Sequence, residues 1–104
     1  MIKLQLTTKN IPLADDVKRI VREKLSKLDK FLSKLPPDLV KAVVMLRKRT
    51  HRSEDDLYVT QMAVYVPKKI LHAHQDGYNL EESLNEAVDD IADQLKKYKE
   101  KTKV

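Results

Sequence analysis

The last quarter of the chain, residues 79–103, carries the strongest helical pattern in the sequence. Apolar side chains recur there at helical spacing and fall on one stripe of an amphipathic helix of about five or six turns. The stripe consists of Leu80, Leu84, Ala87, Val88, Ile91, Leu95 and Tyr98. Asn79 is a suitable N-cap, and Glu82 three residues later completes a capping-box pattern. Such a helix needs an apolar surface to cover, which the rest of the chain must supply.

The charges along this expected helix are sorted. Residues 80–93 contain six acidic residues and no lysine or arginine, whereas residues 94–104 contain five lysines and one glutamate. Acidic residues at the start and basic residues at the end complement the helix dipole. The same lysines would also form a basic tip that attracts phosphate groups. Both interpretations are open at this point.

The charge of the whole chain is divided just as unevenly. The formal net charge of the 104 residues is +5, but residues 18–52 hold twelve basic and three acidic residues, and residues 53–93 hold two basic and ten acidic ones. A site for a polyanion is therefore expected in residues 18–52 and 94–104. No window approaches the roughly 20 apolar residues of a membrane-spanning helix, and the first residues lack an apolar signal. We expect a single cytoplasmic domain over residues 1–104.

The sequence predicts four strands and one further helix. Ile2, Leu4 and Leu6 alternate with polar residues and predict a strand. Residues 14–34 have a helical apolar stripe that ends before Pro36 and Pro37. Further strands are expected at 39–50, 57–66 and 70–75, joined by a polar loop at 51–56 and a tight turn at 67–69. In the third strand the inward side chains should be Met62, Val64 and Val66, with Gln61 and Tyr65 facing outward.

The order β-α-β-β-β-α predicts an α+β fold. Two amphipathic helices each need one surface to cover, and three consecutive strands can be joined by hairpins. A four-stranded mixed sheet with both helices packed on one face satisfies these requirements. A right-handed crossover would place the first strand parallel to the second. The other face of the sheet would then be open to solvent.

Four lysines follow one flank of the first helix. They are Lys24, Lys27, Lys30 and Lys34. Lysines spaced by about one turn can track a phosphate backbone without reading bases. Lysines also commonly coat a helix beside its apolar stripe. The pattern alone does not separate these two readings.

Residues with catalytic or metal-binding chemistry are few. His72 and His74 share one side of a strand, but the chain has no cysteine, and a third ligand would have to be a carboxylate. No serine lies in a recognisable nucleophile turn, and the single glycine, Gly77, excludes glycine-rich phosphate loops. We therefore expect neither an enzyme, a metal site nor a cofactor.

The open sheet face offers a second kind of site. Tyr65 is one aromatic residue, whereas RNA-reading sheets usually carry two or three. Met45, Val43 and Val59 would instead form an apolar patch for weak self-association. The chain is thus expected to be a monomer or a weak homodimer, and a protein-interaction module using this face is an alternative function.

Several stretches together resemble one known family, the ribosome hibernation promoting factors, also called ribosome-associated inhibitor A or sigma-factor modulation proteins. The residues that carry the resemblance are TTKN at 7–10, REKLSKLDKF at 22–31, VYVPKKILHA at 64–73 and QLKKYKEK at 94–101. No single motif is specific, but together with the order of elements they cover essentially the whole chain. The resemblance is to the short form, which lacks a C-terminal dimerisation domain.

The resemblance implies a fold similar to double-stranded RNA-binding domains and a function without catalysis. Members of the family bind the small ribosomal subunit in the channel used by mRNA and tRNA, and so inhibit translation in stationary phase or stress. They do so with basic residues of both helices against ribosomal RNA. Carried over by position, the RNA-binding residues here are Lys9, Lys24, Lys27, Lys30, Lys96, Lys97, Lys99 and Lys101.

The sequence departs from the family pattern at two positions. Family members usually have a basic residue where this chain has Asp90, and another where it has Asp93. We expect these two carboxylates to pair with lysines of the first helix and to weaken ribosome binding, because each lost phosphate contact lowers the affinity.

Overall fold

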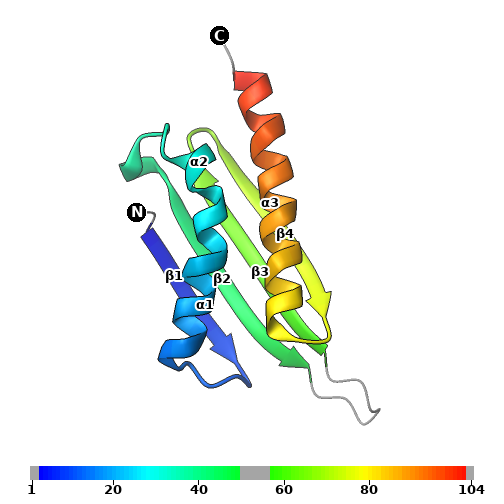
Figure 1. Ribbon diagram of the computed structural model, residues 1–104. Helices are drawn as coiled ribbons and strands as arrows, with labels where there is room; N and C mark the ends of the chain where they lie inside the picture. The colour runs from blue at the N-terminus through cyan, green and yellow to red at the C-terminus, as the bar shows by residue number, and fades with distance from the viewer. Residues whose placement is uncertain (1–2, 50–56, 103–104) are drawn as a thin grey trace.

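The computed structural model describes residues 3–49 and 57–102 (Figure 1). Four strands and two main helical segments follow one another in the expected order, with short 3₁₀ turns between them. The elements are β1 (Lys3–Lys9), α1 (Asp15–Leu25), η1 (Ser26–Leu28), α2 (Asp29–Leu32), η2 (Pro37–Leu39), β2 (Lys41–Arg49), β3 (Leu57–Val66), β4 (Lys69–Gly77) and α3 (Leu80–Thr102).

The strands form one mixed sheet in the order β1-β2-β3-β4. β1 runs parallel to β2, with Leu4 opposite Ala42, and the other two pairings are antiparallel. The α1–α2 segment and α3 lie side by side on the same face of this sheet (Figure 1). The predicted α+β class, strand order and arrangement of the helices are therefore confirmed.

The core lies between the sheet and the helices. Alternate residues of β2 and β3 point into it, among them Val44, Leu46 and Val64, which are fully buried. The expected apolar stripe of α3 covers them, and its Leu84, Ala87, Val88, Ile91 and Leu95 are buried. Full burial of a Leu, Ile or Val side chain contributes about 1.5–3 kcal/mol, so this interface dominates the stability of the fold. Met62, Val64 and Val66 face inward, as predicted.

The sequence predicted one continuous helix over residues 14–34, but the structure shows an interrupted one. α1 ends at Leu25, a 3₁₀ turn follows over Ser26–Leu28, and α2 adds only four residues. The Ser26 hydroxyl donates a hydrogen bond of 2.6 Å to the carbonyl of Glu23. A serine that bonds back to the preceding turn competes with the regular helical bonds and often bends a helix. The apolar period cannot reveal this, because a 3₁₀ turn also leaves Leu28 in the core.

The start of α3 is fixed by three contacts. Asn79 caps the helix by accepting a hydrogen bond of 2.8 Å from the backbone N–H of Glu82, as predicted. The buried hydroxyls of Thr60 and Ser83 are 2.9 Å apart and join the first turn to β3. Gly77 lies so close that an added Cβ would be 2.7 Å from the backbone nitrogen of Ser83.

The strand boundaries differ from the prediction in two places. β4 is longer than residues 70–75, because Lys69 pairs with Val66 and Gly77 pairs with Tyr58. The turn before it is therefore only Pro67 and Lys68. β2 begins at Lys41 rather than at residue 39, because Pro37–Leu39 form a 3₁₀ turn. The expected loop at 51–56 and the strand position Ile2 lie outside the described residues.

Side chains of α3 hold the edge strand β4 and the turn before it. The Gln94 amide donates a hydrogen bond of 2.6 Å to the carbonyl of His72, and the Tyr98 hydroxyl donates one of 2.9 Å to the carbonyl of Pro67. Unpaired backbone groups on an edge strand invite pairing with other chains, so such contacts protect the edge. They also fix the direction in which the lysine-rich end of α3 leaves the sheet.

Candidate nucleic-acid interface

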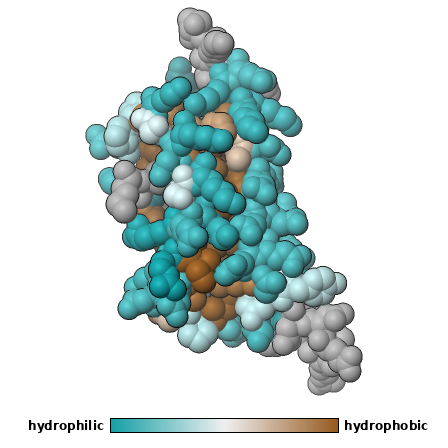
Figure 2. Space-filling view, viewed as in Figure 1, coloured by the Kyte–Doolittle hydropathy of each residue, from teal (hydrophilic) through white to brown (hydrophobic). Residues whose placement is uncertain are grey.

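A groove runs along the helix layer between the α1–α2 segment and α3. Its volume is about 650 Å³, and its lining residues are Ser26, Lys27, Lys30, Phe31, Val88, Asp89, Ala92, Asp93 and Lys96. Figure 2 shows that this face of the molecule is mostly hydrophilic, with an apolar area exposed between the helices in its lower half. The groove itself combines the charged side chains with the apolar ones of Phe31, Val88 and Ala92.

Three lysines follow one another along the interrupted first helix. Lys24, Lys27 and Lys30 are spaced by three residues, which is the repeat of a 3₁₀ turn, where side chains at i and i+3 eclipse one another. Lys27 lies in η1 itself, and Lys30 follows at the start of α2. Lys27 and Lys30 are exposed and line the groove, while Lys24 is half-buried one turn earlier. Two of these three lysines, Lys27 and Lys30, thus line one groove, and we call Lys24, Lys27 and Lys30 the lysine row.

Phe31 connects this row to the lysines of α3. The Nζ atom of Lys30 is 5.1 Å from the centroid of the Phe31 ring, and the Nζ atom of Lys99 is 5.3 Å from the same centroid. Both distances fall within the range of a cation–π interaction. Lys96 lines the groove one turn before Lys99. Lysines from both helical segments therefore meet around one buried aromatic ring.

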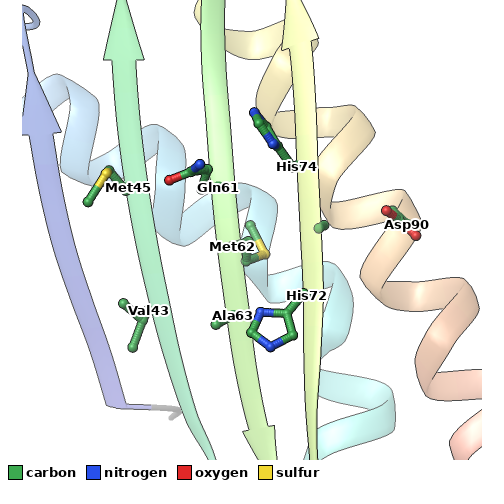
Figure 3. A pocket seen from close by; sticks show the side chains of 9 residues that line it. Val43, Met45, Gln61, Met62, Ala63, His72, His74 and Asp90 are labelled. Carbon is green, nitrogen blue, oxygen red and sulfur yellow. The ribbon is translucent and has the colours of Figure 1, made fainter.

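Two carboxylates of α3 face the same groove, but they are not the predicted pair. Asp89 and Asp93 line it, whereas Asp90 accepts hydrogen bonds of 3.4 Å from Gln75 and 3.1 Å from Gln94. Figure 3 shows Asp90 beside β4, and Asp90 is not among the residues that line the groove. The expectation that Asp90 pairs with a lysine of the first helix is wrong. Within the described residues, Asp89 and Asp93 form no ion pair shorter than 4.0 Å with a lysine.

The remaining predicted RNA-binding residues lie apart from the groove. Lys97 is exposed on α3 but does not line it. Lys9 ends β1 and pairs in register with Arg47, at the end of the sheet where α1 begins (Figure 1). Lys101 belongs to α3, but its side chain lies outside the described part of the chain. The structure thus brings Lys27, Lys30, Lys96 and Lys99 together.

The open face of the sheet carries a shallow hollow of about 470 Å³. Val43 and Met45 of β2, Gln61 and Ala63 of β3, and His72 and His74 of β4 line it (Figure 3). Met45 and Tyr65 are each 40% exposed, as the outward positions predict. Val59 was expected in this apolar patch, but it is only 1% exposed. It lies in register between the longer side chains of Arg47 and Asp76.

His72 and His74 lie on this open face, as the strand pattern predicted. The Nε2 atom of His74 is 4.0 Å from a carboxylate oxygen of Asp76. Over residues 3–49 and 57–102, no three histidine or carboxylate side chains are arranged to hold a metal ion. In the same part of the chain, no helix is long and apolar enough to cross a bilayer.

Sequence reasoning missed two residues of the groove. Phe31 was counted only as part of the apolar stripe, although its position next to Lys30 is a signal for a cation–π contact. Asp89 is treated there only as one of the six acidic residues of 80–93. The helical period places Asp89 and Asp93 only about 40° apart around α3, so these two carboxylates had to share one side of the helix.

Comparison with known proteins supports the fold and identifies the family. The ribosome hibernation promoting factor of Escherichia coli (strain K12) is 26% identical over 102 residues, which cover 98% of each chain. The protein of the same name from Salmonella typhimurium is 24% identical over the same coverage.

Two solved structures have the same fold. The N-terminal domain of Thermus thermophilus Protein Y superposes with a TM-score of 0.75 at 20% identity, covering 94% of this chain and 99% of that one. A ribosomal subunit interface protein from Coxiella burnetii gives a TM-score of 0.70 at 14% identity, covering 94% and 98%. The sequence profile described as "Sigma 54 modulation protein / S30EA ribosomal protein" matches residues 4–103, and the chain therefore belongs to this family.

Proposed function

We propose that this protein is a ribosome-associated translation inhibitor, a hibernation factor that occupies idle ribosomes. It binds ribosomal RNA of the small subunit, in the channel that mRNA and tRNA use, and it acts in the cytoplasm in stationary phase or under stress. Membership of the family supports this proposal, as do the relatives named ribosome hibernation promoting factors. The mechanism is steric: the bound protein occupies space that mRNA and tRNA need, and it catalyses nothing.

The observation that carries the proposal is the meeting of two lysine sets at one end of the helix layer. Lys27 and Lys30 come from the first helical segment, and Lys96 and Lys99 come from α3. Both sets belong to the basic segments that the charge distribution singles out. Lysines bind phosphates without reading bases, so the contacts give affinity and orientation rather than recognition of a base sequence. A ribosomal RNA surface, with closely spaced phosphates from several strands, suits such a cluster.

Co-sedimentation with purified small subunits at several salt concentrations tests this proposal. A Lys24→Glu, Lys27→Glu, Lys30→Glu variant removes one lysine row. Each phosphate contact contributes about 0.7–0.9 to the slope of log affinity against log salt. Loss of three contacts should lower that slope by about 2–3 and move the variant into the supernatant at moderate salt.

The matched control changes three exposed lysines away from the groove, Lys3, Lys18 and Lys41, to glutamate. This control alters the net charge by the same amount. It should keep most of the salt slope if the groove is the binding site. Equal losses in the two variants would mean that only overall charge matters. Native protein that stays in the supernatant at low salt would contradict the proposed function itself.

The alternative function is a protein-interaction module that uses the open sheet face, with ribosome binding weakened by the acidic residues of α3. The hollow beside His72 and His74, and the exposed Met45 and Tyr65, favour this alternative. It predicts binding that depends little on salt and that is lost when Met45 or Tyr65 is changed to a charged residue. Ribosome binding that survives Met45→Glu and Tyr65→Glu would exclude it as the basis of that binding.

A further inference from the structure

We propose that Phe31 is a positioning residue for ribosomal RNA binding, because its ring holds Lys30 and Lys99 as a pair that binds neighbouring phosphates. This inference rests on the proposed function and assigns a role to a side chain that carries no charge itself. We call Lys30, Phe31 and Lys99 the lysine clamp.

The geometry of the clamp joins two parts of the chain that are distant in sequence. Lys30 and Phe31 lie in α2, and Lys99 lies near the end of α3. Each Nζ atom is within 5.3 Å of the ring centroid, so the two nitrogens are at most about twice that distance apart. Phe31 is only 9% exposed and is part of the core. The core thus fixes the position of the ring, and the ammonium groups of both lysines lie against it.

The ring offsets a cost of bringing two positive charges together. Two ammonium groups repel each other, and the negative faces of an aromatic ring attract both. Lys30 is exposed, and a lysine in water normally samples many rotamers, so binding must immobilise it. A side chain that already lies over a ring loses less freedom when a phosphate arrives. Preorganisation of this kind raises affinity without adding a contact.

Loss of this positioning role should change the affinity and the salt slope differently from loss of a lysine charge. In a Phe31→Leu variant both lysines remain and can still reach phosphates, but they are no longer held in place. Affinity for small subunits should fall about tenfold, which is within the range expected when two long side chains must be ordered on binding, while the salt slope stays nearly unchanged. Changing Lys30 to Gln should instead lower the slope by about 1.

The control is Leu32→Val, which also reduces a buried side chain of α2 but removes no ring beneath a lysine. Its affinity should stay within about twofold of the native value, since no phosphate contact depends on it. A Phe31→Tyr variant keeps the aromatic ring and should therefore bind small subunits with native affinity. If Phe31→Leu does not fold, as judged by circular dichroism, Phe31→Met provides a second ring-less side chain with more freedom to fill the space.

A double-mutant cycle shows whether Phe31 acts through the lysines. In a Lys30→Gln, Lys99→Gln background there is nothing left for the ring to position. Phe31→Leu should then change the affinity by less than about twofold. A full tenfold loss in that background would overturn the inference, because Phe31 would be acting on the fold or on RNA directly.

A measurement on the free protein separates this inference from the proposed function. In NMR spectra the ε-methylene protons of Lys30 and Lys99 should be shifted upfield by the ring, and the shift should vanish in Phe31→Leu. Native binding with unchanged affinity in Phe31→Leu would overturn the inference and leave the proposed function standing. Absence of the ring shift in the native protein would also overturn it. Failure of the native protein to bind small subunits would overturn both.

Discussion

Neutralising the two carboxylates of the groove should strengthen ribosome binding, whereas neutralising the carboxylate between them should not. Asp89 and Asp93 line the groove with Lys27, Lys30 and Lys96, and they repel any phosphate that enters it. The matched control is Asp90→Asn. It changes the net charge by as much as either single substitution, but Asp90 lies beside β4 and accepts hydrogen bonds from side-chain amides.

The size of the effect follows from Coulomb's law. At a separation of about 8 Å in a water-like dielectric of about 80, one carboxylate opposes one phosphate by about 0.5 kcal/mol. Asp89→Asn and Asp93→Asn together should therefore stabilise the complex by about 1 kcal/mol, which corresponds to about fivefold tighter binding. The gain should shrink at high salt, because the groove is open and exposed charges are screened.

Titration of fluorescently labelled protein with purified small subunits at low salt measures this difference. The double variant Asp89→Asn, Asp93→Asn should bind about fivefold more tightly than the native protein, and Asp90→Asn should change the dissociation constant by less than about twofold. If Asp90→Asn strengthens binding as much as the double variant, the orientation of α3 does not decide the interface. If no variant strengthens binding, the groove is not the site that meets RNA.

Three further substitutions test the parts of the fold that hold α3 and the turn. Gly77→Ala should lower the free energy of unfolding by about 1–3 kcal/mol, because the added Cβ meets the backbone of Ser83 at 2.7 Å, and thermal unfolding should show this as a lower melting temperature. Lys68→Gly should raise that temperature by a few degrees, since Lys68 has φ of 68° and the left-handed region costs a non-glycine residue about 1 kcal/mol; no change would mean that the turn relaxes freely. Asn79→Ala removes the cap on the Glu82 N–H and should cost about 1 kcal/mol in urea unfolding, whereas Asn79→Asp should cost little.

The faces of the sheet and of α3 could be predicted from sequence because burial on one side leaves a simple period. Val44 and Leu46 alternate with outward residues, and Leu84, Val88, Ile91 and Leu95 follow the helical repeat. These patterns also sufficed for the strand order, since three strands joined by short connections leave few arrangements. They do not depend on any particular side-chain contact.

The groove could not be predicted in the same way because it depends on contacts rather than on periods. Ser26 ends α1 through one hydrogen bond to Glu23, and the apolar stripe continues past this point without a break. Asp89 and Asp90 are neighbours in sequence, but they lie about 100° apart around α3, so that only Asp89 lines the groove while Asp90 accepts a hydrogen bond from Gln94. The packing of α3 on the sheet decides which side of the helix faces the first helix. The charge pattern carries no information about this packing. The pairing of Lys99 with Phe31 depends on the same packing.

The most direct test of the central claim is lysine footprinting by mass spectrometry. The free protein and its complex with small subunits are acetylated briefly, and the modification of each lysine is compared. The account predicts that Lys27, Lys30, Lys96 and Lys99 are protected in the complex, while the exposed Lys3 of β1 and Lys41 of β2 react as in the free protein. Protection of Lys3 and Lys41 without protection of the four groove lysines would contradict it, and would place the interface on the open face of the sheet.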